Sequence, residues 1–165
     1  MDEFEKRLWN ARLDAQFNVL YWGYLGNRYE RWNQSLKIFL AVFSSGTVAS
    51  WLILSGNEIV WKCFSMITAL AGVIQSFLQW DQLIKTYTEL RSPWVEIWGE
   101  LDSLWIEFHE NSNRKVLLKK CQQLRHDITN ARMNQKCIYL DKKLCEKCYN
   151  EIWNQVIKNK KAGIS

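Results

Sequence analysis

IFLAVFSSGTVASWLILSGN (residues 38–57) and CFSMITALAGVIQSFLQW (residues 63–80) are two runs of 20 and 18 residues that contain no charged residue. A helix of about 20 mainly apolar residues spans the hydrocarbon core of a bilayer, which is roughly 30 Å thick. The intervening Ser55-Gly56-Asn57-Glu58 is a turn signal, because Gly and Asn tolerate the backbone conformation that ends a helix. The sequence therefore predicts a transmembrane hairpin with spans at about 36–55 and 59–80.

The charges outside the hairpin predict its orientation. The mean hydropathy of −0.28 is typical of a soluble chain, but the charges are very unevenly distributed along the 165 residues. Lys62 is the single base at the hairpin tip, whereas the other 21 of the 22 Lys and Arg residues lie at the start of the first span or outside the hairpin. Bases near span ends favour the cytoplasmic side, so we expect both termini in the cytoplasm.

Tryptophans flank the predicted spans in a pattern typical of an aromatic belt. We expect Trp32 and Trp80 at the inner interface, and Trp61 with Trp51 near the outer one. The first 35 residues are too polar for a signal peptide, so the first span is expected to act as the uncleaved insertion signal.

Apolar residues at alternating spacings of four and three predict long helices on both sides of the hairpin. One such seam extends from Phe4 to Leu36 and another from Leu83 to Phe108. We expect the second seam to continue the second span as a stalk, with a kink at Ser92-Pro93 rather than a new helix, because its phase is kept there. The residues of this seam expected between helices of the assembly are Leu90, Trp94, Ile97, Leu101 and Leu104.

Two more amphipathic helices are expected in the tail, one from about Arg114 and one from about Leu140. No strand pattern occurs, so the predicted fold class is all-α and oligomeric. Its parts are an N-terminal cytoplasmic helix (1–35), the transmembrane hairpin (36–80) and a cytoplasmic helical stalk and tail (81–165).

Motifs for catalysis or metal binding are not recognisable in the sequence. His109 and His126 lie in separate predicted helices without a nearby nucleophile, and no phosphate-binding glycine loop or HExxH motif occurs. Cys145 and Cys148 form a single CxxC without a second pair at zinc spacing, so adjacent helix faces explain them better than a metal or redox site. We expect no enzyme, no cofactor and no metal.

The second span carries a stripe of polar and small residues at spacings of three and four, which reaches the outer mouth at Glu58. Its other members are Ser65, Thr68, Gly72, Gln75 and Gln79. Glutamines in hydrocarbon are costly unless they face protein or water. The stripe either lines a pore or mediates helix packing, and both interpretations stay open. Two spans cannot enclose a channel, so a pore requires several copies of the chain.

A basic cluster in the tail consists of Arg114, Lys115, Lys119, Lys120 and Arg125, followed by His126. A solvated or lipid-facing helix face explains this cluster best. The alternative is a site for a nucleotide or short nucleic acid, because phosphate contacts dominate the affinity for such ligands.

The hairpin, the aromatic-basic run from Tyr21-Trp22-Gly23-Tyr24 to Arg28-Tyr29-Glu30-Arg31-Trp32 and the helical extensions resemble the SLATT and related two-transmembrane effectors of bacterial anti-phage systems. The resemblance covers roughly residues 1–110 and is one of architecture. It implies a pore in the bacterial inner membrane, controlled by the nucleotide product of a partner nucleotidyltransferase, as in Hailong- or CBASS-type systems. Activation during infection would breach the membrane and stop growth of the infected cell.

Two other functions remain open. One is a membrane scaffold that anchors a partner and conducts nothing, and the other is a phage-type holin, for which the 85 residues after the second span form a long tail. If the chain is a pore-forming effector, its expected partners are the bilayer, other copies of the chain and a nucleotide or short oligonucleotide ligand. The expected number of subunits is four.

Overall fold

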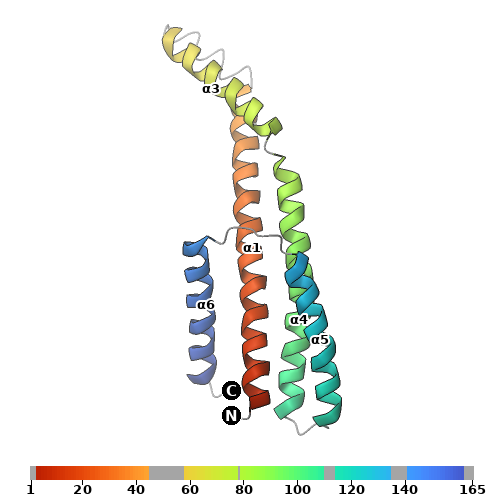
Figure 1. The fold of residues 1–165 in the computed structure, drawn as a ribbon. Coiled ribbons are helices and arrows are strands. Elements are labelled where there is room, and N and C mark those ends of the chain that lie inside the picture. Colours follow the sequence, from red (N-terminus) through yellow and green to blue (C-terminus); the bar gives the residue numbers. More distant parts are fainter. Residues whose placement is uncertain (1–2, 45–57, 78, 110–113, 135–140, 162–165) are drawn as a thin grey trace. The chain divides into compact units, whose positions relative to one another are not determined.

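The computed structural model describes residues 3–44, 58–77, 79–109, 114–134 and 141–161 (Figure 1). Apart from Gln79 and Asp141 this part of the chain is helical, which confirms the all-α class. The helices are α1 (Glu3–Ser44), α3 (Glu58–Phe77), α4 (Trp80–His109), α5 (Arg114–Asn134) and α6 (Lys142–Lys161). Most of the first predicted span and the predicted turn after it lie outside the described residues.

The chain divides into two compact units. Unit 1 combines residues Met1–Leu25 with Thr86–Ser165, and unit 2 is Gly26–Lys85. Both α1 and α4 contribute residues to each unit.

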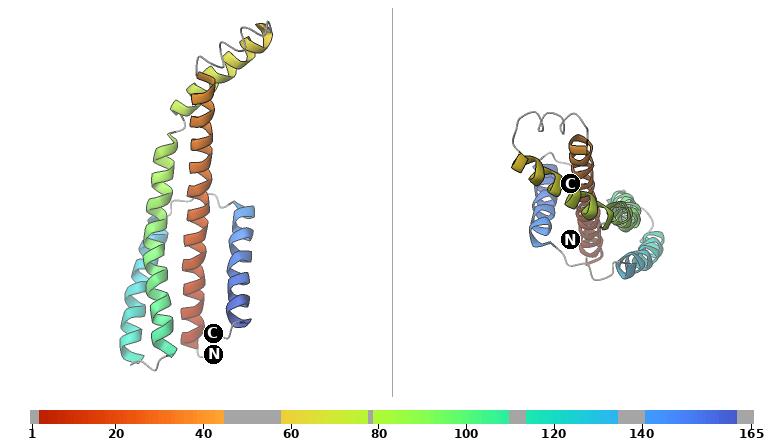
Figure 2. Two further views of the ribbon diagram at one scale, coloured as in Figure 1. Left: turned by 180° about the vertical axis from the view of Figure 1, so that it is seen from behind. Right: turned by 90° about the horizontal axis from the view of Figure 1, so that it is seen from above.

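The core of unit 1 lies between its helices. In this unit α1 lies between α6 and α4, and α5 packs beside α4 (Figures 1 and 2). Apolar residues seven apart on α1 are buried, as the predicted seam requires, with Leu8 at 5%, Ala15 at 0% and Trp22 at 3% exposure. Burial of one large apolar side chain contributes about 1.5–3 kcal/mol. The other helices supply the rest of this core: Tyr87, Trp94, Ile97, Leu101 and Leu104 of α4, Leu117, Leu124 and Ala131 of α5, and Cys148 and Ile152 of α6.

Four residues of the α4 seam expected in the assembly, Trp94, Ile97, Leu101 and Leu104, are buried within one chain, whereas Leu90 is half-buried. Ring pairs join α1 to α4 along its length, with centroid distances of 5.6 Å for Phe4–Phe108, 5.1 Å for Trp9–Trp105 and 6.1 Å for Trp22–Tyr87. Arg12 of α1 also forms an ion pair of 2.5 Å with Asp102 of α4. This seam therefore packs two helices of the same subunit together.

The second span was expected to continue into the stalk without a break, and this expectation is wrong. Helix α3 ends at Phe77 and α4 begins at Trp80. Gln79 between them has a φ of 39°, the left-handed conformation that ends a helix. Its carbonyl accepts hydrogen bonds from the backbone N–H groups of Gln82 (2.9 Å) and Leu83 (3.2 Å), which opens α4.

Pro93 does not divide α4. The helix is continuous from Trp80 to His109, so the alternative of a new helix starting at Ser92-Pro93 is wrong. Gly23 does not interrupt α1 either, and a Cβ atom at this position would lie 3.3 Å from Arg91 Nε of α4. Because Gly23 has no side chain, the Arg91 side chain can lie close to the α1 backbone.

In the described ranges, no helix combines the length and apolar character needed to cross a membrane.

Candidate functional site

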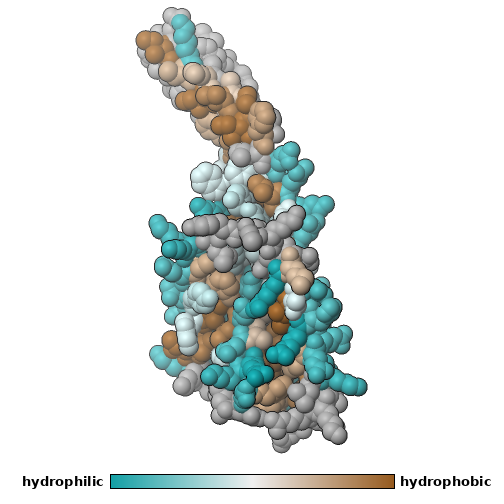
Figure 3. Space-filling model, viewed as in Figure 1, coloured by the Kyte–Doolittle hydropathy of each residue, from teal (hydrophilic) through white to brown (hydrophobic). Residues whose placement is uncertain are grey.

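The apolar side chains of α3 are exposed. Figure 3 shows hydrophobic atoms over much of its described surface. Seven large apolar residues on this helix are between 49% and 82% exposed: Ile59, Met66, Ile67, Leu70, Val73, Ile74 and Phe77. Three others in unit 2, Trp32, Ile38 and Val42, are between 47% and 64% exposed. An exposed apolar surface of this extent marks contact with another protein, a membrane or a ligand.

Unit 2 lacks an apolar core among its described residues. All fifteen hydrophobic residues that are buried in the described ranges belong to unit 1. In the described part of unit 2, Asn33 is the single buried residue, at 5% exposure. Unit 1 therefore has a core of its own, whereas the described part of unit 2 has none.

A small polar cluster joins α1 to the first turn of α4 within unit 2. Asn33 Nδ2 donates a hydrogen bond of 3.0 Å to Asp81 Oδ1, and Lys37 Nζ lies 3.6 Å from the same oxygen. The rings of Tyr29 and Trp80 lie beside them, 5.7 Å apart. The apolar periodicity of the sequence gave no signal for Asn33. Its neighbour Trp32, expected at the inner interface, is 63% exposed.

The predicted belt is described only in part. Trp51 and the side chain of Trp61 lie outside the described residues.

The predicted polar stripe is also described only in part. Thr68 and Gly72 are half-buried on α3, and a Cβ atom added at Gly72 would meet no heavy atom within 4 Å. Gln79 lies beyond the end of α3 and is exposed, so it does not continue the helical stripe as expected. The side chains of the other three members, Glu58, Ser65 and Gln75, lie outside the described part of the structure.

The basic cluster of α5 is described only in part. Lys119, Lys120 and Arg125 are exposed, while the side chains of Arg114 and Lys115 lie outside the described part. Lys120 Nζ forms an ion pair of 2.9 Å with Glu107 of α4. A partly exposed pair of this kind contributes at most about 1 kcal/mol.

A groove of about 560 Å³ runs between α4 and α5 in unit 1. Gly99 and Ser103 leave room in it, and Leu104 and Leu124 provide apolar surface. Glutamates line the α4 side: Glu96, Glu100 and Glu107. Of these, Glu107 pairs with Lys120, whereas neither Glu96 nor Glu100 forms an ion pair with another described residue. The groove therefore combines small and apolar surface with negative charge.

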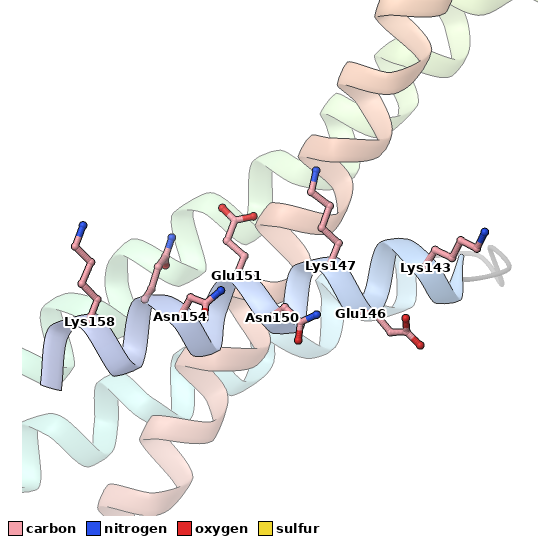
Figure 4. Close-up of a pocket in the computed structure, with 8 residues that line it drawn as sticks. Lys143, Glu146, Lys147, Asn150, Glu151, Asn154 and Lys158 are labelled. Carbon is pink, nitrogen blue, oxygen red and sulfur yellow. The ribbon is translucent and has the colours of Figure 1, made fainter. Parts of the chain in front are cut away.

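Helix α6 carries lysines and glutamates along another surface. Lys143, Lys147 and Lys158 lie with Glu146 and Glu151 along a shallow surface of about 600 Å³ (Figure 4). Three large residues at spacings of four on the same helix are exposed: Tyr149 at 56%, Trp153 at 60% and Ile157 at 48%. Aromatic and basic side chains therefore share the exposed part of α6.

The inner side of α6 is anchored to α1. Tyr24 Oη donates a hydrogen bond of 2.6 Å to Glu151 Oε2, and this bond raises the pKa of Tyr24. Lys147 Nζ lies 3.8 Å from the centre of the Tyr24 ring, a cation–π contact. The backbone N–H of Asp141, just before α6, donates to Tyr21 Oη at 3.1 Å, and burial raises the pKa of Tyr21.

The CxxC cysteines lie on the inner part of α6. Cys148 is fully buried, and burial together with nearby Cys145 raises its pKa to about 11. Burial also raises the pKa of Cys145. A thiol with a raised pKa is protonated and unreactive at neutral pH. Within the described ranges, no group of three or more His, Cys, Asp and Glu side chains is arranged to hold a metal ion.

Comparison of the chain with protein-family models, curated proteins and solved structures gives no match.

Proposed function

We propose that this chain is a membrane protein whose subunits assemble around α3 to form an ion-conducting pore. The observation that carries the proposal is the division of apolar residues between the two units. The described part of unit 2 buries no hydrophobic side chain, yet its helix α3 exposes seven large ones. Leaving such surface in water is unfavourable by about 25 cal/mol per Å². A bilayer and neighbouring copies of α3 would remove it from water.

The sequence supports the same proposal. The charge-free runs at 38–57 and 63–80 include residues outside the described ranges, and together they have the length of two spans. Thr68 and Gly72 on α3 belong to the polar stripe, while Ile67, Leu70 and Ile74 lie among the exposed apolar residues. A helix with a narrow polar face and a wide apolar face suits a position between a water-filled path and lipid.

The biological setting that we propose follows the resemblance to SLATT and related effectors. In that setting the pore lies in the bacterial inner membrane with both termini in the cytoplasm, and a nucleotide signal opens or closes it during phage infection. The non-conducting scaffold is the alternative, and the exposed surface of α3 would then contact only lipid and protein.

Ion flux through the pore is the property that separates these functions. We expect the purified chain in liposomes to release a trapped ion, and we expect Gly72→Leu to reduce that release. A Cβ atom added at Gly72 has no heavy atom of the described residues within 4 Å, so we expect the larger side chain to narrow a central path between subunits. Leu70→Phe is the matched control, because it adds volume to the exposed apolar surface.

The outcomes distinguish the proposals directly. Flux that falls with Gly72→Leu and persists with Leu70→Phe supports the pore. No flux from an inserted protein in the presence and absence of nucleotides contradicts conduction. Reporters fused before Met1 and after Ser165 test insertion separately, and a chain recovered entirely from the soluble fraction would contradict the membrane proposal itself.

A further inference from the structure

The exposed side of α1 changes in character along unit 2. Arg28, Arg31 and Ser35 are exposed, and further along the helix Ile38 and Val42 are 64% and 47% exposed. These positions follow one another at alternating spacings of three and four, so they share one face of the helix. This 28–42 face is therefore cationic at one end and apolar at the other.

The opposite side of the same segment contacts α4. Asn33 Nδ2 and Lys37 Nζ lie 3.0 and 3.6 Å from Asp81 Oδ1. The rings of Tyr29 and Trp80 are 5.7 Å apart. Because an α-helix has 3.6 residues per turn, the positions that contact α4 lie across the helix axis from the 28–42 face. This face therefore points away from α4.

These contacts also place two changes of surface at the same level. On α1 the exposed described residues are apolar after Lys37, which lies beside Asp81. On the other side of the contact, Phe77 at the end of α3 is 82% exposed, four residues before Asp81. Trp32, at 63% exposure, lies near this boundary. A common boundary between polar and apolar surface, with tryptophan beside it, is typical of a membrane–water interface.

We infer that the 28–42 face binds an anionic phospholipid of the cytoplasmic leaflet. Arg28 and Arg31 bind the phosphate group, and the acyl chains contact Ile38 and Val42. Guanidinium groups suit the first role, because they donate two parallel hydrogen bonds to phosphate oxygens. The inference rests on the proposed membrane insertion and adds to it a class of lipid and a binding site.

The length of the face agrees with this ligand. Arg28 and Val42 are fourteen positions apart, which is about 21 Å along an α-helix. One leaflet with its headgroups is about 20–22 Å thick. A free phosphate or a nucleic acid would contact only the cationic end and would leave Ile38 and Val42 in water, which is unfavourable for apolar side chains.

The charge of the segment selects an anionic lipid over a zwitterionic one. Residues 26–37 contain three bases, Arg28, Arg31 and Lys37, and one acid, Glu30, which gives a net charge of +2. Anionic lipids of the cytoplasmic leaflet attract bases near the membrane surface. The choline group of phosphatidylcholine instead brings a positive charge next to its phosphate, and the two arginines repel it.

Native mass spectrometry of the full chain in a non-ionic detergent measures the binding. At equal concentrations, we expect phosphatidylglycerol to bind at least about fivefold more than phosphatidylcholine. Arg28→Gln together with Arg31→Gln should reduce this difference to within about twofold. Lys6→Gln together with Arg7→Gln is the matched control, because these two bases are also exposed on α1 but belong to unit 1. An excess of inorganic phosphate should leave phosphatidylglycerol bound, since phosphate has no acyl chains.

Photolabelling of the unchanged chain gives a measurement that does not depend on any variant. Phosphatidylglycerol with a diazirine in its acyl chain is reconstituted with the chain in phosphatidylcholine vesicles. We expect illumination to label peptides that contain Ile38 or Val42, and the corresponding diazirine phosphatidylcholine to label them at least about threefold less. Circular dichroism of the two double variants establishes that their helices are retained.

Several outcomes would overturn the inference. Equal binding of the two lipids, or an equal loss in both double variants, would show that these arginines recognise no particular headgroup. Displacement by inorganic phosphate would indicate a simple anion site, and equal labelling by the two diazirine lipids would show that the 28–42 face meets bulk lipid. If the chain inserts and conducts ions without this selectivity, the pore proposal stands and the lipid inference fails. If phosphatidylglycerol binds at this face and no ions flow, the reverse holds.

Discussion

Leu101 tests whether the α4 seam holds one subunit together or joins subunits. Its side chain is 2% exposed, and Leu101→Ala would remove three carbon atoms from the contact between α1 and α4. Buried Leu→Ala substitutions cost about 2–5 kcal/mol, and the cost increases with the volume of the cavity that remains. The Trp9–Trp105 ring pair and the Arg12–Asp102 ion pair join α1 and α4 on neighbouring turns, which limits collapse of the helices into the cavity. We therefore expect a loss of about 3 kcal/mol or more.

This loss should appear as reduced stability of the fold. A change of 1 kcal/mol shifts the Tm of a small domain by about 4–8 °C, so Leu101→Ala should lower the Tm of unit 1 by about 12 °C or more. Thermal unfolding followed by circular dichroism in detergent measures it. Met133→Ala is the control, because Met133 is 75% exposed and such substitutions usually change stability by less than about 0.5 kcal/mol.

Light scattering below the Tm supplies the decisive comparison. Since the seam is intramolecular, the variant should keep the mass of the original assembly while it remains folded. A variant with unchanged Tm but reduced mass would refute this reasoning and return the seam to the interface between subunits.

Three further predictions concern single groups. Replacing buried Asn33 by Asp should destabilise the chain more than Asn33→Leu, because it sets two carboxylates side by side at Asp81; equal Tm values of the two variants in thermal unfolding at pH 7 would contradict this. Gln79→Gly should raise the free energy of unfolding by up to about 1 kcal/mol, because glycine adopts a φ of 39° without strain, and Gln79→Val should lower it, because valine does not. Equal denaturation midpoints of the two variants would contradict a left-handed conformation at residue 79. The free energy of unfolding should fall between about pH 9 and pH 11 because of Cys148, whose thiol ionises near pH 9.0 in the unfolded state and near pH 11 in the folded state. The unfolded state binds fewer protons in this range, and the slope for one group reaches about 1.4 kcal/mol per pH unit. Urea unfolding of Cys148→Ala at several pH values should show a smaller slope.

The periodicity of apolar residues predicted the helices of unit 1 well. An amphipathic tail helix was expected from about Arg114, and α5 buries Leu117, Leu124 and Ala131. This success has a simple cause, since a helix with an apolar face every three or four residues must bury that face. The pattern did not identify the partner, however. A buried face at Leu101 and Leu104 looks the same whether α1 of the same chain or a neighbouring subunit covers it.

The helix break at Gln79 and the burial of Asn33 are two features that local sequence patterns could not predict. Neither Gly nor Pro marks the junction of α3 and α4, and glutamine is a good helix former, so local propensity gave no signal for a left-handed residue. Asn33 is buried because Asp81, 48 residues away, accepts its hydrogen bond. A contact so distant in the sequence is invisible to any analysis of local spacing. The same holds for the groove, whose walls come from two helices.

The stripe of α3 and the basic cluster of α5 stay predictions of the sequence. Thr68 and Gly72 occupy neighbouring turns of one helix, as the spacing requires. In the tail, Lys120 is engaged by Glu107 of α4 and lies at the groove between α4 and α5.

Position 15 of α1 tolerates few side chains other than that of Ala15. Its methyl group is fully enclosed where α1 meets its neighbours, so even a slightly larger side chain must push helices apart, at a cost of about 1–3 kcal/mol. The exposed positions of α3 have no such geometric restriction and should exchange readily among Leu, Ile, Val and Met. Randomised libraries would consequently show an inverted pattern, with the small, chemically plain residue of α1 almost fixed and the bulky apolar surface of α3 interchangeable. Labels and affinity tags for imaging are therefore best attached away from the middle of α1.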